Sequence, residues 1–363
     1  MNKCILFLLS VMLTCQVSQS LAQIKIHSRE IDSIVTQFMT NDKVPGVAIA
    51  ILHQNSTLYI NTYGIANLEQ NIKVTPNTVF ELASVTKQMT AALITTLAYE
   101  GKLSLDDKIS KYIDSIPDTW QPITIRQLLG HMGGLIHGFE PMVNGSYLLD
   151  YSKEFMLEAA KKAPMKSTPG TDWEYSDQGY FLAGYVAERA TGKTFDSLMN
   201  EKFFKPMKMT NTRFLNQKDI IPNRAGGYVI TNGEYKNNRR QWQFELTPHF
   251  GVMSTIDDMV KFDKGVTNGI IKKNVFDEIT TPNRIFYKDS IQQISYGMGW
   301  QIHDFGDRRI VVHSGYTGTV YLKDLKTGLS IIVLTNRDAN QGTSQHVLTK
   351  RIAKEVDKSF PSF

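Results

Sequence analysis

Strand-like patterns lie at both ends of this chain, and helical patterns fill much of the sequence between them. Near the start, an apolar run over 47–52 and a β-rich run over 57–63 flank a polar turn, which predicts a hairpin. Four more strand-like runs follow one another over 297–335, while helical patterns dominate 84–190. We therefore expect an α+β fold: one antiparallel sheet built from both chain ends and flanked by helices, with a helical lobe, roughly 81–225, inserted.

Three shorter patterns predict further elements. Apolar residues at helical spacing over 179–191 predict a helix that ends at Gly192. The stretch 228–235 carries an Asn-Gly pair between two β-rich segments, which is typical of a tight hairpin. An amphipathic pattern predicts a last helix over about 341–356.

The first residues have the features of a removable secretory signal. A positive charge at Lys3 precedes an apolar run over 4–15 that is short for a bilayer span, and Ser20-Leu21-Ala22 offers a small-x-small cleavage site. An uncleaved anchor is the alternative, but no longer apolar run follows. We expect residues 1–22 to be a signal peptide and residues 23–363 to form one large domain or two intimately packed lobes. We expect the protein to be exported to the periplasm or secreted, without a stable membrane span.

Cysteine content and charge exclude several kinds of site. The two cysteines, Cys4 and Cys15, both lie in the predicted signal, so the remaining chain has no disulfide, no cysteine-ligated metal and no cysteine nucleophile. The net charge of +5 is dispersed, and the densest basic run, 236–240, holds three positive residues, which argues against nucleic-acid binding. The residues between His131 and His137 include no acidic side chain, so no metal site is expected.

One motif for nucleophilic catalysis stands near the start of the long helical region. Ser84 and Lys87 form the only S-x-x-K sequence in the chain. On a helix over 83–98, positions three apart share one face, so the lysine amine would lie beside the serine hydroxyl. In the first helical turn, free backbone N–H groups could receive an oxyanion. The alternative is a helix cap followed by a solvated charge.

Two further segments could complete such a site. Tyr175 stands in a loop immediately before a predicted helix, where a tyrosine usually packs its ring and leaves its hydroxyl in water. His313 and Gly315 stand at a strand end, where a glycine would let a substrate backbone lie close to the strand.

Taken with Ser84 and Lys87, these segments give the chain a clear resemblance to the serine β-lactamase-related hydrolases. That family includes class C β-lactamases, penicillin-binding D-alanyl-D-alanine carboxypeptidases, D-amino-acid peptidases and related esterases. Its motifs S-x-x-K, Y-x-N and [KH]-x-G are matched in order, and the similarity runs from about residue 44 to about 336. The matching segments are 84–87, 175–177 and 313–315, with supporting matches at 104–109, 124–135, 169–170, 253–259 and 334–336.

The resemblance implies a β-lactamase/transpeptidase-like fold and covalent catalysis. Ser84 would attack a carbonyl and form an acyl-enzyme, with Lys87 and Tyr175 sharing the proton transfers. The backbone N–H groups of Ser84 and Tyr316 would form the oxyanion hole. Ser314 and Gly315 would contact the substrate. No cofactor and no metal are implied.

The chain departs from the family pattern at two positions assigned to substrate binding. Asp177 stands where asparagine is usual; an ionised carboxylate can only accept hydrogen bonds, and beside Lys87 it would favour the charged ammonium and weaken the lysine as a base. His313 stands where penicillin-recognising peptidases carry lysine. With an ordinary pKa of about 6.5 it would lose its charge near neutral pH and anchor a substrate carboxylate weakly.

The sequence therefore predicts a serine hydrolase that cleaves an amide or ester of a small-molecule or peptide substrate. Candidate substrates are D-amino-acid peptides, esters and β-lactam-like compounds. Two alternatives stay open: a non-catalytic module that binds peptidoglycan or a peptide, and a true class C-like β-lactamase. The sequence does not choose between water and an amine as acyl acceptor, nor does it set an oligomeric state.

Overall fold

A computed structural model describes residues 26–139, 142–143, 146–147, 150–238, 243–339 and 345–362 of the chain. The predicted signal peptide, 1–22, lies outside these residues. Among the residues described, no helix is both long and apolar enough to cross a bilayer. The division of the chain at residue 22, and the lobe boundaries near 81 and 225, stay predictions.

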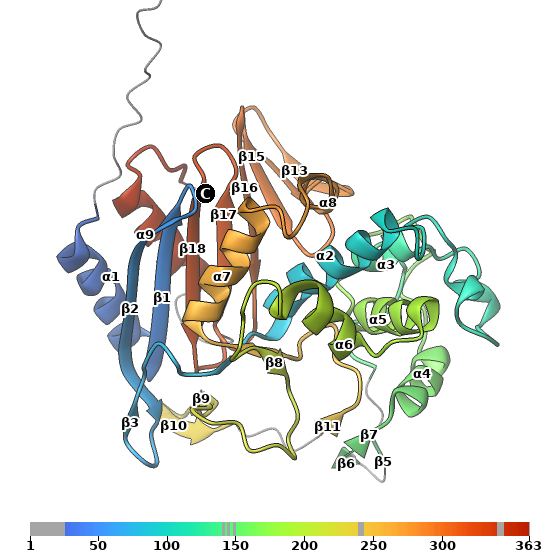
Figure 1. Ribbon diagram of the computed structural model, residues 1–363, viewed down its shortest axis with the longest axis horizontal. Coiled ribbons are helices and arrows are strands. Elements are labelled where there is room, and N and C mark those ends of the chain that lie inside the picture. The colour runs from blue at the N-terminus through green and yellow to red at the C-terminus, as the bar shows by residue number, and fades with distance from the viewer. Residues whose placement is uncertain are drawn as a thin grey trace, which may run out of the picture.

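A nine-stranded antiparallel sheet forms the centre of the molecule (Figure 1). The first and last strands in the sequence meet in it: β1 pairs with β18, Val47 opposite Thr335, which confirms a sheet built from both chain ends. The order across the sheet is β13 (Arg284–Lys288), β14 (Gln293–Tyr296), β15 (Gln301–Phe305), β16 (Arg308–Ser314), β17 (Val320–Asp324), β18 (Leu329–Thr335), β1 (Gly46–His53), β2 (Ser56–Asn67) and β3 (Ile72–Lys73).

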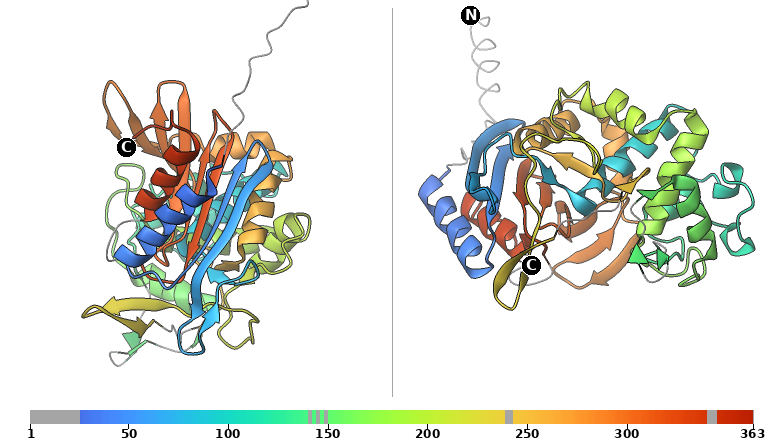
Figure 2. Two further views of the ribbon diagram at one scale, coloured as in Figure 1. Left: turned by 90° about the vertical axis from the view of Figure 1, so that its left-hand side faces the viewer. Right: turned by 90° about the horizontal axis from the view of Figure 1, so that it is seen from below.

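Helices cover both faces of this sheet, which explains why β1 is apolar along its whole length rather than alternating. Val47, Ile49 and Ile51 pack with α1 (Ser28–Asn41) and α9 (Gln345–Val356), two helices that lie side by side on one face (Figure 2). The intervening residues of β1 belong to the larger core on the opposite face, where α7 crosses the sheet (Figure 1). Helices on this second side are α2 (Thr86–Tyr99), α7 (Ile256–Thr267) and α8 (Lys273–Ile279).

The remaining helices gather beside the sheet, beyond α2 (Figure 1). Helix α2 is buried along nearly its whole length, because it lies between the sheet side and this group. These helices are α3 (Ile125–Leu129), α4 (Lys153–Lys162), α5 (Asp177–Thr191) and α6 (Phe195–Met199). The short strands outside the large sheet are β4 (Phe80–Glu81), β5 (Met142–Val143), β6 (Ser146–Tyr147), β7 (Asp150–Tyr151), β8 (Arg213–Phe214), β9 (Tyr228–Thr231), β10 (Glu234–Asn237), β11 (Gln243–Phe244) and β12 (Val252–Ser254).

Several local predictions are confirmed, and others fail for identifiable reasons. Helix α5 ends at Gly192, which has the left-handed conformation expected of a C-terminal glycine. The Asn-Gly turn joins β9 to β10. The segment 100–124 is not helical apart from short 3₁₀ turns, because the Asp107 carboxylate accepts the Ser104 N–H and closes a turn instead. The β13–β14 hairpin was not predicted, because every residue of β13 is exposed and the strand lacks an apolar alternation.

A buried ion pair fastens α7 to the sheet. The Asp263 carboxylate accepts hydrogen bonds from Lys323 Nζ at 2.9 Å and from Tyr321 Oη at 2.6 Å. Both charged side chains are almost fully buried, so removing one partner leaves a charge without compensation.

We therefore expect Asp263→Ala to lower the free energy of unfolding by about 3–5 kcal/mol in chemical denaturation. The matched control is Asp277→Ala, which removes a carboxylate from the exposed pair with Lys273 and should change the unfolding free energy little. Equal stabilities of the two variants would contradict this role for Asp263.

Candidate active site

Ser84 lies in a 3₁₀ turn, Ala83–Val85, that leads into α2. Ala83 has a positive φ of 48°, which is uncommon for a residue with a side chain and marks a strained entry to the turn. The end of β16 presses against this turn: a Cβ at Gly315 would lie 2.4 Å from the Leu82 carbonyl oxygen. Gly315 is therefore needed because a side chain there would collide with the protein's own backbone. The sequence had suggested a different reason, namely room for the backbone of a substrate.

Lys87 is completely buried one helical turn after Ser84. Its ammonium has three protons, and three acceptors surround it: Ser84 Oγ at 3.2 Å, Asp177 Oδ1 at 2.6 Å and the His249 carbonyl at 2.8 Å. Burial lowers the pKa of Lys87, and the Asp177 charge opposes that shift. The charged amine is fully hydrogen-bonded, yet its proton is held less tightly than on an exposed lysine.

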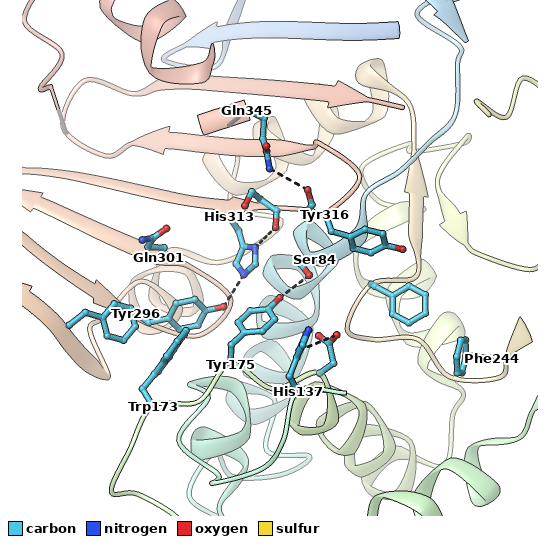
Figure 3. A pocket seen from close by; sticks show the side chains of 15 residues that line it. Ser84, His137, Trp173, Tyr175, Phe244, Tyr296, Gln301, His313, Tyr316 and Gln345 are labelled. Carbon is cyan, nitrogen blue, oxygen red and sulfur yellow. Dashed lines mark hydrogen bonds and ion pairs between the residues drawn. The ribbon is translucent and has the colours of Figure 1, made fainter. Parts of the chain in front are cut away.

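Tyr175 precedes α5 and donates its phenolic hydrogen to Ser84 Oγ at 2.8 Å (Figure 3). Its ring lies against Lys87 Nζ, 4.8 Å from the ring centroid. Burial, and then the negative charge of Asp177, raise the pKa of the phenol well above 10. In the resting site Tyr175 is therefore a proton donor rather than a phenolate. His131, set aside as a metal ligand, packs on this ring at 4.5 Å and accepts the Ser176 N–H at 3.1 Å, which is a structural role.

Asp177 is the first residue of α5, where the helix N-terminus favours a negative charge. Burial opposes its ionisation, but Lys87, His249 and His137 together lower its pKa. Its two oxygens face different partners: Oδ1 contacts Lys87 at 2.6 Å, and Oδ2 lies 3.6 Å from His137 Nδ1. The ion pair expected from the sequence between Asp177 and Lys87 is present.

His313 is buried at the end of β16, and the expectation that it titrates near neutral pH is wrong. Nδ1 lies 2.9 Å from the Ser314 carbonyl, which can only accept, so Nδ1 carries the hydrogen and Nε2 accepts from Tyr296 Oη at 3.0 Å. Burial, followed by the charge of Lys87, lowers the pKa of His313 to about 3. The sequence could not show this burial.

We therefore expect the His313 ring resonances to stay constant from pH 5 to pH 8. A group with a pKa of about 3 is neutral throughout that range, so it offers no cation to a substrate carboxylate at any of these pH values. Histidine-labelled NMR, with the resonance assigned through His313→Gln, measures this directly. A titration with a midpoint near 6.5 would contradict it.

A pocket of about 710 Å³ opens above Ser84 (Figure 3). The predicted residues Ser84, Tyr175, Asp177, His313, Ser314, Gly315 and Tyr316 all line it. Aromatic side chains form its walls, and among the residues described the lining includes neither lysine nor arginine. Trp173 packs against Phe286 at 4.6 Å and against Tyr296 at 5.6 Å, while Phe244 and Phe250 contribute a second aromatic pair.

Sequence reasoning missed these aromatic side chains and His137. Trp173 stands two residues before Tyr175, but Phe286 and Tyr296 come from the hairpin that the pattern did not predict. His137 and Asp177 are separated by 40 positions, and only the fold brings them together. No group of three or more potential metal ligands occurs among the residues that the structure describes.

The serine hydrolases of the β-lactamase superfamily are defined by a serine that is hydrogen-bonded to a buried lysine and a tyrosine, between an antiparallel sheet and a group of helices. The family model described as Beta-lactamase matches residues 31–353. The chain belongs to the beta-lactamase family.

Curated relatives of moderate similarity extend over most of the chain. Protein flp of Staphylococcus aureus (strain MRSA252) is 26% identical over 329 residues, covering 85% of this chain and 62% of flp. A protein of Escherichia coli (strain K12) named "Putative D-alanyl-D-alanine carboxypeptidase" is 27% identical over 342 residues, covering 81% of this chain and 78% of the relative. The chain thus spans about three fifths of the length of flp.

Solved structures share the fold at lower sequence identity. The octameric penicillin-binding protein homologue from Pyrococcus abyssi superposes with a TM-score of 0.79 at 24% identity, covering 93% of this chain and 80% of that one. EstCE1, a hydrolase with promiscuous acyltransferase activity, gives 0.78 at 20% identity, with coverages of 90% and 97%. The D-amino acid amidase from Ochrobactrum anthropi SV3 gives 0.76 at 22% identity, with coverages of 91% and 98%. These likenesses confirm the β-lactamase/transpeptidase-like fold.

Proposed function

We propose that the protein cleaves an uncharged ester or amide through an acyl-enzyme on Ser84. The observation that carries this proposal is the environment of one atom: Ser84 Oγ contacts Lys87 Nζ at 3.2 Å and Tyr175 Oη at 2.8 Å beneath an aromatic pocket. A serine hydroxyl becomes an effective nucleophile when a neighbouring group accepts its proton. Cleavage of the substrate bond then leaves the acyl group on Ser84.

The proton transfers follow from the contacts. Lys87 passes a proton to Asp177 across 2.6 Å, and the neutral amine takes the Ser84 proton as Oγ attacks the carbonyl carbon. The backbone N–H groups of Ser84 and Tyr316 are proposed to bind the oxyanion. As the carbon–leaving group bond breaks, Tyr175 protonates the leaving group and recovers a proton from Lys87, which recovers one from Asp177. The net transfer is from Ser84 to the leaving group.

The pocket supports substrates without a carboxylate near the reacting carbonyl. His313 is neutral, and the described lining has no lysine or arginine to pair with an anion, whereas Asp177 repels one. The aromatic walls favour an apolar or aromatic acyl group. A D-alanyl-D-alanine carboxypeptidase must hold a terminal carboxylate, so the pocket favours an esterase or amidase over the activity named for the Escherichia coli relative. We also propose that the protein is exported, with residues 1–22 as its signal peptide.

The function is tested with two p-nitrophenyl esters at pH 8, one of phenylacetic acid and one a monoester of glutaric acid. We expect hydrolysis of both above the buffer rate, with kcat/KM at least about tenfold higher for the phenylacetate, because the anion finds no cation in the pocket. Penicillin hydrolysis faster than either ester would favour the β-lactamase alternative. No hydrolysis of any of the three would favour the binding module.

A further inference from the structure

We propose that His137 is the catalytic base of the deacylation step and that Asp177 positions it and returns its proton to the nucleophile. This inference rests on the proposed acyl-enzyme and assigns its hydrolysis to a residue that the nucleophile motifs do not include. Figure 3 shows His137 beside Tyr175 at the pocket. The Nδ1 atom of His137 faces the Asp177 carboxylate. The ring centroids of His137 and Tyr175 lie 5.3 Å apart.

The carboxylate at position 177 joins an interior partner to a pocket partner. Oδ1 is bound to the buried Lys87, and Oδ2 faces the His137 ring nitrogen at 3.6 Å. An asparagine has one acceptor oxygen; with that oxygen toward Lys87, its NH₂ group would face His137 and could not accept a proton from it. The carboxylate that replaces the usual asparagine at position 177 thus gives His137 an acceptor at its Nδ1 side. The separation is longer than a hydrogen bond, as catalytic contacts often are before substrate binds.

The other titratable groups at the site are poorly placed to activate water. Lys87 is buried and has all three protons engaged, and Tyr175 is a donor with a raised pKa. Both ring nitrogens of His313 are already hydrogen-bonded. His137 differs from them, because 64% of its side chain is exposed while it lines the pocket together with Ser84.

The step balances without an added reactant. The oxygen of a water molecule bonds to the acyl carbonyl carbon while its proton passes to His137 Nε2. Lys87 protonates Ser84 Oγ as the bond between Oγ and the carbonyl carbon breaks, which leaves the amine neutral. The imidazolium gives the proton on Nδ1 to Asp177 Oδ2. The protonated carboxyl then turns about its Cβ–Cγ bond and gives this proton to the Lys87 amine, which restores the ion pair. The acid product leaves, and the exposed His137 exchanges tautomer through solvent.

The test separates the two halves of the reaction by rapid mixing with p-nitrophenyl phenylacetate. In His137→Gln we expect a burst of p-nitrophenolate near one equivalent, at the wild-type burst rate, followed by a kcat at least about tenfold below wild type. Mass spectrometry of the quenched variant should show the acyl adduct accumulating on the peptide that contains Ser84. The matched control, His53→Gln, changes a histidine of β1 outside the pocket and should behave as wild type.

A double-variant cycle tests the link to Asp177. If Asp177 acts through His137, adding His137→Gln to Asp177→Asn should lower the rate constant for decay of the acyl adduct no further, whereas independent effects would add. The proposal is overturned if His137→Gln keeps the wild-type kcat, if it raises only KM, or if its loss lies in the burst rate. Absence of an acyl adduct on Ser84 in every protein would overturn the proposed function as well; an adduct that turns over normally in His137→Gln would overturn only the role of His137.

Discussion

Ser84→Ala is expected to lower kcat/KM for p-nitrophenyl phenylacetate by at least about 10⁴-fold. The substitution removes the oxygen to which both Lys87 and Tyr175 hydrogen-bond, and leaves the pocket walls and the neighbouring amides in place. The residual rate would come from binding and oxyanion stabilisation alone. Burst kinetics and steady-state rates on the purified variant measure the loss.

A second serine makes this prediction specific. Ser314 also lines the pocket, and its Oγ lies 2.9 Å from His346 Nε2, so it forms a serine–histidine pair of its own. Burial lowers the pKa of His346 to about 4, which leaves that imidazole neutral and able in principle to accept a proton. Ser314→Ala should nevertheless retain the burst, since neither Lys87 nor Tyr175 contacts Ser314 Oγ in the described hydrogen bonds. Loss of the burst in Ser314→Ala, with activity kept in Ser84→Ala, would place the nucleophile on Ser314.

Lys87→Met is expected to lower kcat/KM, which reports acylation, by about 10³–10⁴-fold. The amine is the group that takes the Ser84 proton, and methionine fills its volume without replacing that function. The acylation burst should slow in parallel with kcat/KM, because the loss falls on formation of the acyl-enzyme. Lys273→Met, at an exposed lysine of α8, is the matched control and should keep wild-type kinetics.

Stability must be separated from catalysis at this position. Lys87→Met leaves the Asp177 carboxylate without its closest cation, so the variant should also melt at a lower temperature. In Lys87→Met/Asp177→Asn the carboxylate is gone, and we expect Tm to recover while kcat/KM stays low. Recovery of kcat/KM together with Tm would show that Lys87 acts only by stabilising the fold.

The sequence predicted the parts of the site that follow local spacing. Ser84 and Lys87 lie three residues apart on one helical face, and Tyr175 precedes the helix that begins at Asp177, so their chemistry could be inferred before their contacts were known. The sheet from both termini followed from apolar runs at the two ends of the chain. The pairing of β1 with β18 confirms that inference, and the runs are continuous because helices cover both faces.

What the sequence could not show depends on burial and on long-range packing. His313 was assigned an ordinary titration because nothing in a local pattern reveals that Tyr296 and Lys87 surround it. The aromatic wall was missed because Phe286 comes from an exposed hairpin strand without alternation. His137 was considered only as a metal ligand, and its position opposite Asp177 appears once the chain is folded.

That Ser84 carries the acyl group is tested most directly by mapping the adduct formed during turnover. Wild-type protein mixed with p-nitrophenyl phenylacetate, quenched in acid within the burst phase and digested, should yield one phenylacetyl adduct, on the peptide that contains Ser84, and none in Ser84→Ala. An adduct on another residue, or steady turnover with no adduct at any quench time, would contradict an acyl-enzyme on Ser84.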